Sequence, residues 1–114
     1  MENMKNLLDS KLVKYNDSVV PKIPVFEGQD MTSEVYYFKP GQILKEHRHP
    51  SGEQIFFFLK GNGKMRVGEN TINVGIGCTV FVKSGEWHEI TNGDSEMVAV
   101  QVTKVGAGAE YKES

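Results

Sequence analysis

The stretch GQILKEHRHPSGEQIFFFLKG, residues 41–61, carries the strongest fold signal of the chain. It places His47 and His49 two residues apart in a β-prone segment, and side chains two apart on a strand point to the same face. Pro50 follows directly and favours the end of a strand, because proline cannot donate to a ladder. The run QIFFFL, residues 54–59, then predicts a second strand. We therefore expect two imidazoles on one face, close to the loop that joins two strands.

A second stretch, GCTVFVKSGEWHEITN at residues 77–92, supplies His88. The chain has 3 histidines, so His47, His49 and His88 account for all of them. A His-x-His alone is usually a solvated pair, and the metal hypothesis depends on the third histidine. Two imidazoles from one strand and one from another form a donor set that suits a single divalent transition metal, such as Fe, Mn, Ni or Zn.

The two stretches resemble the two sequence motifs of the cupin superfamily in order and in spacing. The matching residues are Gly41, His47, His49, Gly61, Gly77, Gly85, His88 and Asn92. The resemblance covers about residues 35–105 and implies an all-β double-stranded β-helix, a jelly-roll barrel. It also implies that the three histidines are metal ligands. Lys83 stands where the second motif has a proline, which affects a turn more than the chemistry.

The fourth ligand is open between two neighbouring residues. The first motif has a glutamate separated from its final glycine by six residues, but this chain has Gln54 at that position, and Glu53 lies one residue earlier. A carboxylate is the better ligand by charge. Strand alternation favours Gln54, which shares its face with Phe56 and Phe58. Small cupins with three histidines and a glutamine as ligands resemble this arrangement, and the same alternation predicts that Phe56 and Phe58 line a substrate pocket.

Length and composition indicate one domain in the 114-residue chain. The formal net charge of −2 gives no basic footprint, so nucleic acid is not expected as a partner. No apolar run approaches membrane-spanning length, and no signal peptide is visible, which fits a cytoplasmic protein without a membrane contact. Cys78 is the single cysteine, so an intrachain disulfide is excluded.

The chain divides into three parts. Residues 1–18 are polar and ambiguous, and we expect either a short helix or an arm that lies on a partner subunit. Residues 19–105 contain short β-rich runs separated by turn residues, as in an all-β domain. Residues 106–114, GAGAEYKES, are expected to be a flexible tail. So thin a barrel is expected to form a homodimer, with residues 1–26 docked on the neighbour.

Three functions are compatible with these motifs. A neutral set of three histidines and Gln54 leaves the full charge of the metal, which favours a Lewis-acid enzyme of the isomerase or cyclase type. Its substrate would be a small metabolite with a carbonyl or carboxylate group. Glu53 as ligand would favour a metal-dependent dioxygenase instead. The third alternative is a metabolite sensor or carrier without turnover, because a fold does not imply catalysis. We find no general base in the sequence pattern.

Overall fold

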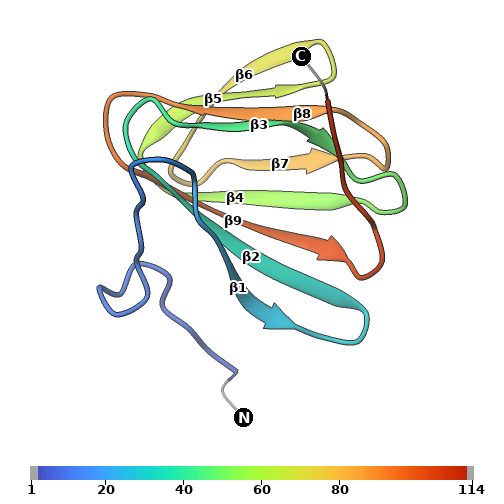
Figure 1. Ribbon diagram of the computed structural model, residues 1–114, viewed down its shortest axis with the longest axis horizontal. Coiled ribbons are helices and arrows are strands. Elements are labelled where there is room, and N and C mark those ends of the chain that lie inside the picture. The colour runs from blue at the N-terminus through green and yellow to red at the C-terminus, as the bar shows by residue number, and fades with distance from the viewer. Residues whose placement is uncertain (1–2, 113–114) are drawn as a thin grey trace.

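The computed structural model describes residues 3–112, and these residues form strands, turns and loops without a helix (Figure 1). The strands are β1 (Lys22–Glu27), β2 (Met31–Phe38), β3 (Ile43–Arg48), β4 (Gln54–Lys60), β5 (Asn62–Val67), β6 (Asn70–Gly75), β7 (Thr79–Val82), β8 (His88–Asn92), β9 (Met97–Lys104) and β10 (Glu110–Tyr111). Residues 1–2 of the expected arm and 113–114 of the expected tail lie outside the described residues. Nothing in the described part of the chain offers a helix that could cross a membrane.

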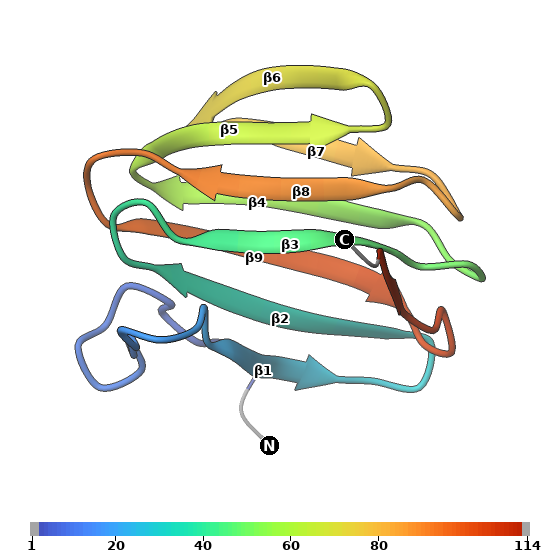
Figure 2. The ribbon, with the colours of Figure 1, turned by 45° about the horizontal axis from the view of Figure 1, so that its top comes forward.

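The strands form two five-stranded sheets that lie face to face (Figures 1 and 2). The first sheet has the order β1-β2-β9-β4-β7, and the second sheet has the order β10-β3-β8-β5-β6. Successive strands such as β3 and β4, or β7 and β8, belong to different sheets, so the chain winds back and forth between the two layers. This winding is the double-stranded β-helix, and the predicted all-β jelly-roll barrel is confirmed.

The core lies between the two sheets and follows from the period-2 alternation of the strands. On β4, Phe56 and Phe58 point inward while Phe57 between them is exposed. Tyr36 and Phe38 on β2 face the same interior, which Met65, Ile90 and Met97 also fill. Each such side chain contributes about 1.5–3 kcal/mol through the apolar surface that it removes from water.

Gly61 makes the abrupt turn between β4 and β5 possible. Its φ is 82°, a left-handed conformation that side chains other than that of glycine rarely adopt. A Cβ at this position would also lie 2.3 Å from the carbonyl oxygen of Glu96. The glycine that closes the first motif is therefore required by backbone geometry and by close packing together.

The arm covers one half of the outer face of the first sheet. Val13 and Tyr15 pack on a second apolar cluster built from β1, β2 and β9. The hydroxyl of Tyr37 donates to the carbonyl of Leu7 at 2.8 Å. Residues 6–13 form turns rather than the short helix considered above, as the bond from the Leu12 amide to the Asp9 carbonyl at 2.9 Å indicates. In this single chain the arm lies on its own barrel (Figure 2).

The other half of this outer face is uncovered and apolar. Phe57 on β4 is 41% exposed and Phe81 on β7 is 52% exposed. Phe81 lies opposite Ile55 in the register of β4 and β7, and Ile55 lies opposite Val102 of β9. Together these side chains form an apolar stripe across three strands.

The segment expected to be a tail returns to the second sheet. Figure 1 shows it in red, running from the end of β9 across one end of the barrel. Its strand β10 pairs with β3, with Glu110 opposite Arg48 and Tyr111 opposite His47. Ala107 is buried against Gly52, where a Cβ would come within 2.6 Å of the alanine Cβ. Residues 107–111 are thus part of the barrel wall.

Candidate metal centre

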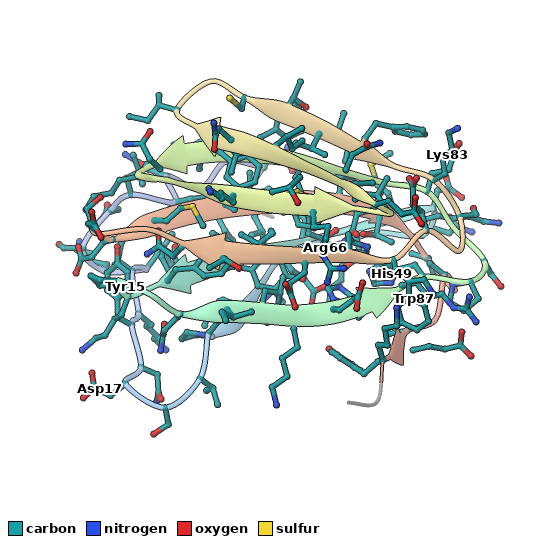
Figure 3. The ribbon with its side chains drawn as sticks, turned by 90° about the horizontal axis from the view of Figure 1, so that it is seen from above. Tyr15, Asp17, His49, Arg66, Lys83 and Trp87 are labelled. Carbon is teal, nitrogen blue, oxygen red and sulfur yellow. The ribbon has the colours of Figure 1, made fainter. Side chains whose placement is uncertain are left out.

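Three histidines converge at the end of the barrel that the last segment crosses. His47 lies on β3 and His88 begins β8, and the two residues are direct cross-strand partners. His49 lies just beyond the end of β3. All three are buried, and one potential ligand atom from each lies within 4.8 Å of the others. Figure 3 shows His49 near Trp87, far from Tyr15 and Asp17 at the other end of the molecule.

A β-bulge in β3 aims these histidines inward. Leu44 pairs with Ile90 and His47 pairs with His88, so three residue steps on β3 match two on β8. Leu44 packs against the core between the sheets. In a regular strand, residues three apart point to opposite faces, and His47 would then point outward. The extra residue restores the inward direction, which is a common use of bulges near functional sites.

The histidine rings are held in one orientation by backbone carbonyls. Nδ1 of His47 donates to the carbonyl of Lys45 at 2.8 Å, and Nδ1 of His88 donates to that of Glu86 at 3.1 Å. Nδ1 of His49 donates to the carbonyl of Gly108 at 2.7 Å. Because a carbonyl only accepts, each Nδ1 carries the proton, and each Nε2 keeps its lone pair for a ligand.

Burial favours the neutral form of His47 and of His88. Loss of hydration, with a smaller effect of the neighbouring His47, lowers the pKa of His88 from 6.5 to about 3. Burial likewise lowers the pKa of His47, and His49 and Lys22 act in the same direction. Neutral imidazole is the form that binds a metal, so neither His47 nor His88 has to lose a proton near neutral pH before an ion can bind.

Gln54 begins β4, and its side chain is turned inward as strand alternation predicts. Its cross-strand partner Thr103 lines the same cleft as His49. Gln54 is 2% exposed, whereas Glu53 is exposed. Both amide atoms of Gln54, Oε1 and Nε2, are buried without a hydrogen-bond partner. Among the described His, Cys, Asp and Glu residues, the group that could hold an ion contains only the three histidines, so Glu53 is not part of it.

Aromatic rings surround the histidines. The ring of Phe56 lies edge-on to His88 at a centroid distance of 5.7 Å, and Phe58 stacks with Phe56 at 6.5 Å. Tyr111 from β10 stacks on His47 at 5.3 Å with an interplanar angle of 29°. The apolar surroundings lower the local dielectric and strengthen any charge interaction at the site.

A polar row at the barrel mouth was missed by sequence reasoning. Gln101 of β9 is buried in the interior. Its side-chain amide nitrogen donates to Glu34 at 2.9 Å, and the hydroxyl of Thr103 donates to the side-chain Oε1 of Gln101. Lys22 forms an ion pair with Glu34 at 3.3 Å. Glu34 and Tyr36 are two residues apart on β2, so strand alternation could have predicted that the Glu34 carboxylate lies on the inner face.

The turn before His88 forms without the proline of the second motif. The amide of Glu86 donates to the carbonyl of Lys83 at 3.0 Å, and the Glu86 carboxylate accepts from the Lys83 amide at 3.1 Å. The amide of Gly85 donates to the carbonyl of His49 at 2.9 Å and ties this turn to the end of β3. Lys83 therefore leaves the placement of His88 intact.

Comparisons with known proteins agree with this geometry. A family model described as "Cupin domain" matches residues 34–103. An uncharacterized conserved protein with a double-stranded β-helix domain from Klebsiella pneumoniae has 21% identity and a TM-score of 0.91 over 100% of both chains. A protein from Thermus thermophilus has 31% identity and a TM-score of 0.83 over 90% of this chain and 97% of its own.

An enzyme is also among the structural neighbours. Oxalate oxidase in complex with the substrate analogue glycolate has 21% identity and a TM-score of 0.75, over 92% of this chain and 63% of the enzyme. At this identity the likeness shows the fold alone. Among curated proteins, none matches the sequence at a significant level.

Proposed function

Since the chain belongs to the cupin family, we propose that it binds one divalent transition metal and presents it to a small oxygen-rich metabolite. The bound ion would act as a Lewis acid on a carbonyl or carboxylate, in an isomerase- or cyclase-like reaction. We assign the ligands as Nε2 of His47, His49 and His88 and Oε1 of Gln54.

One observation carries this proposal. The Nε2 atoms of His49 and His88 and both amide atoms of Gln54 are buried without partners. Gln54 belongs to the same end of the barrel as His49, because its cross-strand partner Thr103 lines a cleft together with His49. A buried polar atom without a partner costs about 1–3 kcal/mol, so such atoms rarely gather without a reason. A cation among the nitrogens and the amide oxygen satisfies the free acceptors together.

The chain's own residues would set the reactivity of this centre. The carbonyls of Lys45, Glu86 and Gly108 fix the imidazole tautomers. The neutral ligand set leaves the positive charge of the ion undiminished, which favours binding of an anionic or carbonyl-bearing ligand. Phe56 would contact the less polar part of that ligand, and we propose that Phe58 supports it from the deeper side.

The first test is metal content. Protein purified without chelator should contain about one equivalent of Fe, Mn, Ni or Zn per chain by elemental analysis, and His88→Ala should lose it. Half-buried Glu89, next in the chain and on the opposite face of β8, provides a matched control, because Glu89→Ala should keep the metal. Retention of metal by His88→Ala at the level of the unaltered chain would show that the site is assigned wrongly.

The second test separates the kinds of function. Keto acids, uronates and diketones would be screened with the metal-loaded protein while dissolved oxygen is recorded. Turnover without oxygen uptake supports the proposal. Metal-dependent oxygen uptake would establish a dioxygenase instead, and tight binding without turnover under every metal would indicate a sensor or carrier.

A further inference from the structure

We propose that the cleft beside His49 is an anion subsite in which Lys22 binds a carboxylate of the ligand. The ligand would then carry two separated oxygen-anion groups, one for the metal and one for Lys22, as a small dicarboxylate does. This inference rests on the proposed function, because it assigns the second end of the same ligand.

The cleft lies between the first two strands, the end of β9 and the segment that follows β9. It has a volume of about 250 Å³ and is lined by Lys22 of β1, Glu34 of β2, Thr103 of β9, His49 and residues 106–109. This volume is slightly below the roughly 300–1,000 Å³ of typical small-molecule pockets, so the cleft suits one end of a small ligand. Because His49 is both in this lining and in the histidine cluster, the cleft adjoins the proposed metal site.

The register of the first sheet places Lys22 toward this cleft. Lys22 is the cross-strand partner of Tyr36, which faces the interior, and residues directly opposite point to the same face. Glu34 lies two residues before Tyr36 on β2 and is therefore on that face as well. The ammonium and the carboxylate meet there at 3.3 Å.

A hydrogen-bonded row holds this pair in place. Thr103 donates to Oε1 of Gln101, which fixes the orientation of the Gln101 amide. The amide nitrogen of Gln101 then donates to Oε1 of Glu34, the same oxygen that Lys22 contacts. Gln101 is buried, so Glu34 is held by a rigid neighbour, while Lys22 remains partly exposed. Glu34 uses one of the three N–H donors of the ammonium, and the other two are free for a ligand.

The charges lining the cleft favour an anion. Lys22 and Lys104 contribute two positive charges, and Glu34 contributes one negative charge, which leaves one positive charge before any ion is bound. A divalent ion at the histidines adds to the same positive potential, and an anionic ligand is drawn toward both centres.

The test uses dicarboxylates of graded length as probes. Nickel-loaded protein would be titrated calorimetrically with malonate, succinate, glutarate and, as a monocarboxylate reference, acetate. At least one dicarboxylate should bind about tenfold more tightly than acetate, as expected for one added charge-assisted hydrogen bond. Lys22→Met should abolish this preference, and Lys64→Met, a matched change of an exposed lysine on β5, should keep it.

A second variant should move affinity in the opposite direction. Glu34→Gln retains an oxygen that can accept from Gln101 and removes the competing charge, so dicarboxylate binding should tighten. Weaker binding by Glu34→Gln would show that the cleft recognises a cationic group, and an unchanged preference in Lys22→Met would show that Lys22 takes no part. Either result overturns the inference, as does the absence of any preference in the unaltered protein.

Metal content distinguishes this failure from failure of the proposed function. Each variant would be analysed for nickel before titration, and all should retain it, because Lys22 and Glu34 are not among the proposed ligands. Full nickel loading without a dicarboxylate preference refutes only the anion subsite. Failure of the unaltered protein to hold nickel refutes the metal site and the subsite with it.

Discussion

Replacement of Gln54 by methionine should stabilise the metal-free protein and weaken its response to metal. Methionine is unbranched and of similar length, so it fills the space without the two unpaired amide atoms. Removal of a buried amide without partners should gain about 1–3 kcal/mol. With an unfolding entropy of about 2.1 cal/mol/K per residue, 114 residues give about 0.24 kcal/mol/K. The melting temperature of chelator-treated protein should therefore rise by about 4–12 °C.

Metal should reduce the stability advantage of Gln54→Met over the unaltered protein. If Gln54 is a ligand, its loss weakens metal binding at least about tenfold, which removes about 1.4 kcal/mol of metal-induced stabilisation. The gain in melting temperature on addition of nickel or manganese should therefore be about 6 °C smaller in Gln54→Met than in the unaltered protein. Circular dichroism melts with and without chelator measure both quantities.

The exposed neighbour Glu53 provides the control. Glu53→Met should change neither the metal-free stability nor the metal-induced gain by more than about 0.5 kcal/mol. Lower stability of metal-free Gln54→Met would refute the reasoning, because it would mean that the amide has good partners in solution. Loss of the metal response in Glu53→Met but not in Gln54→Met would move the fourth ligand to Glu53.

Three further predictions concern pH, the last segment and association. Burial lowers the pKa of His88 to about 3 in the folded metal-free protein, and unfolding lets this residue take up a proton. The free energy of unfolding should therefore be highest above about pH 6.5 and fall by up to about 1.4 kcal/mol per pH unit between there and pH 3. Urea titrations at pH 7.5 and 5.0 should show this difference, and His88→Asn should reduce it. Deletion of residues 106–114 removes the carbonyl that holds His49, so elemental analysis should find at least about tenfold weaker metal retention, whereas deletion of 113–114 alone should have no effect. We also propose that the protein forms a homodimer through the uncovered outer face of the first sheet, where Phe81 is exposed. Light scattering should give twice the chain mass of 12.8 kDa, and Phe81→Lys should give a monomer. A monomeric unaltered protein would refute the dimer.

Local patterns in the sequence were enough to predict the inner face of one strand. Gln54, Phe56 and Phe58 alternate with outward residues over an uninterrupted ladder, and period-2 reasoning needs no more than that. The three histidines and the spacing around them likewise predict the cluster, because both motifs are short and continuous. Gly61 shows why this motif position requires glycine, because a larger residue does not fit the turn.

What escaped prediction depends on distant contacts. The bulge between Leu44 and His47 is a property of how β3 pairs with β8, and the β3 sequence alone does not show it. The ion pair of Lys22 and Glu34 depends on the register of β1 with β2 and on Gln101 of β9. Tyr111 lies against His47 because the last segment of the chain pairs with β3. The short polar sequence around Tyr111 does not itself predict a strand.

The contact of the last segment with the histidines has a consequence for how the protein folds. The bond between His49 and the Gly108 carbonyl spans 59 residues, and β10 pairs with β3 across a similar separation. Contacts so distant in sequence carry a large loop-closure entropy and form late in folding. The pairing of β2 with β9 joins residues equally distant in sequence, such as Phe38 with Met97, so the full coordination geometry would appear together with the closure of the barrel. Metal capture would accordingly report a finished barrel, and it would trap the native state instead of nucleating it.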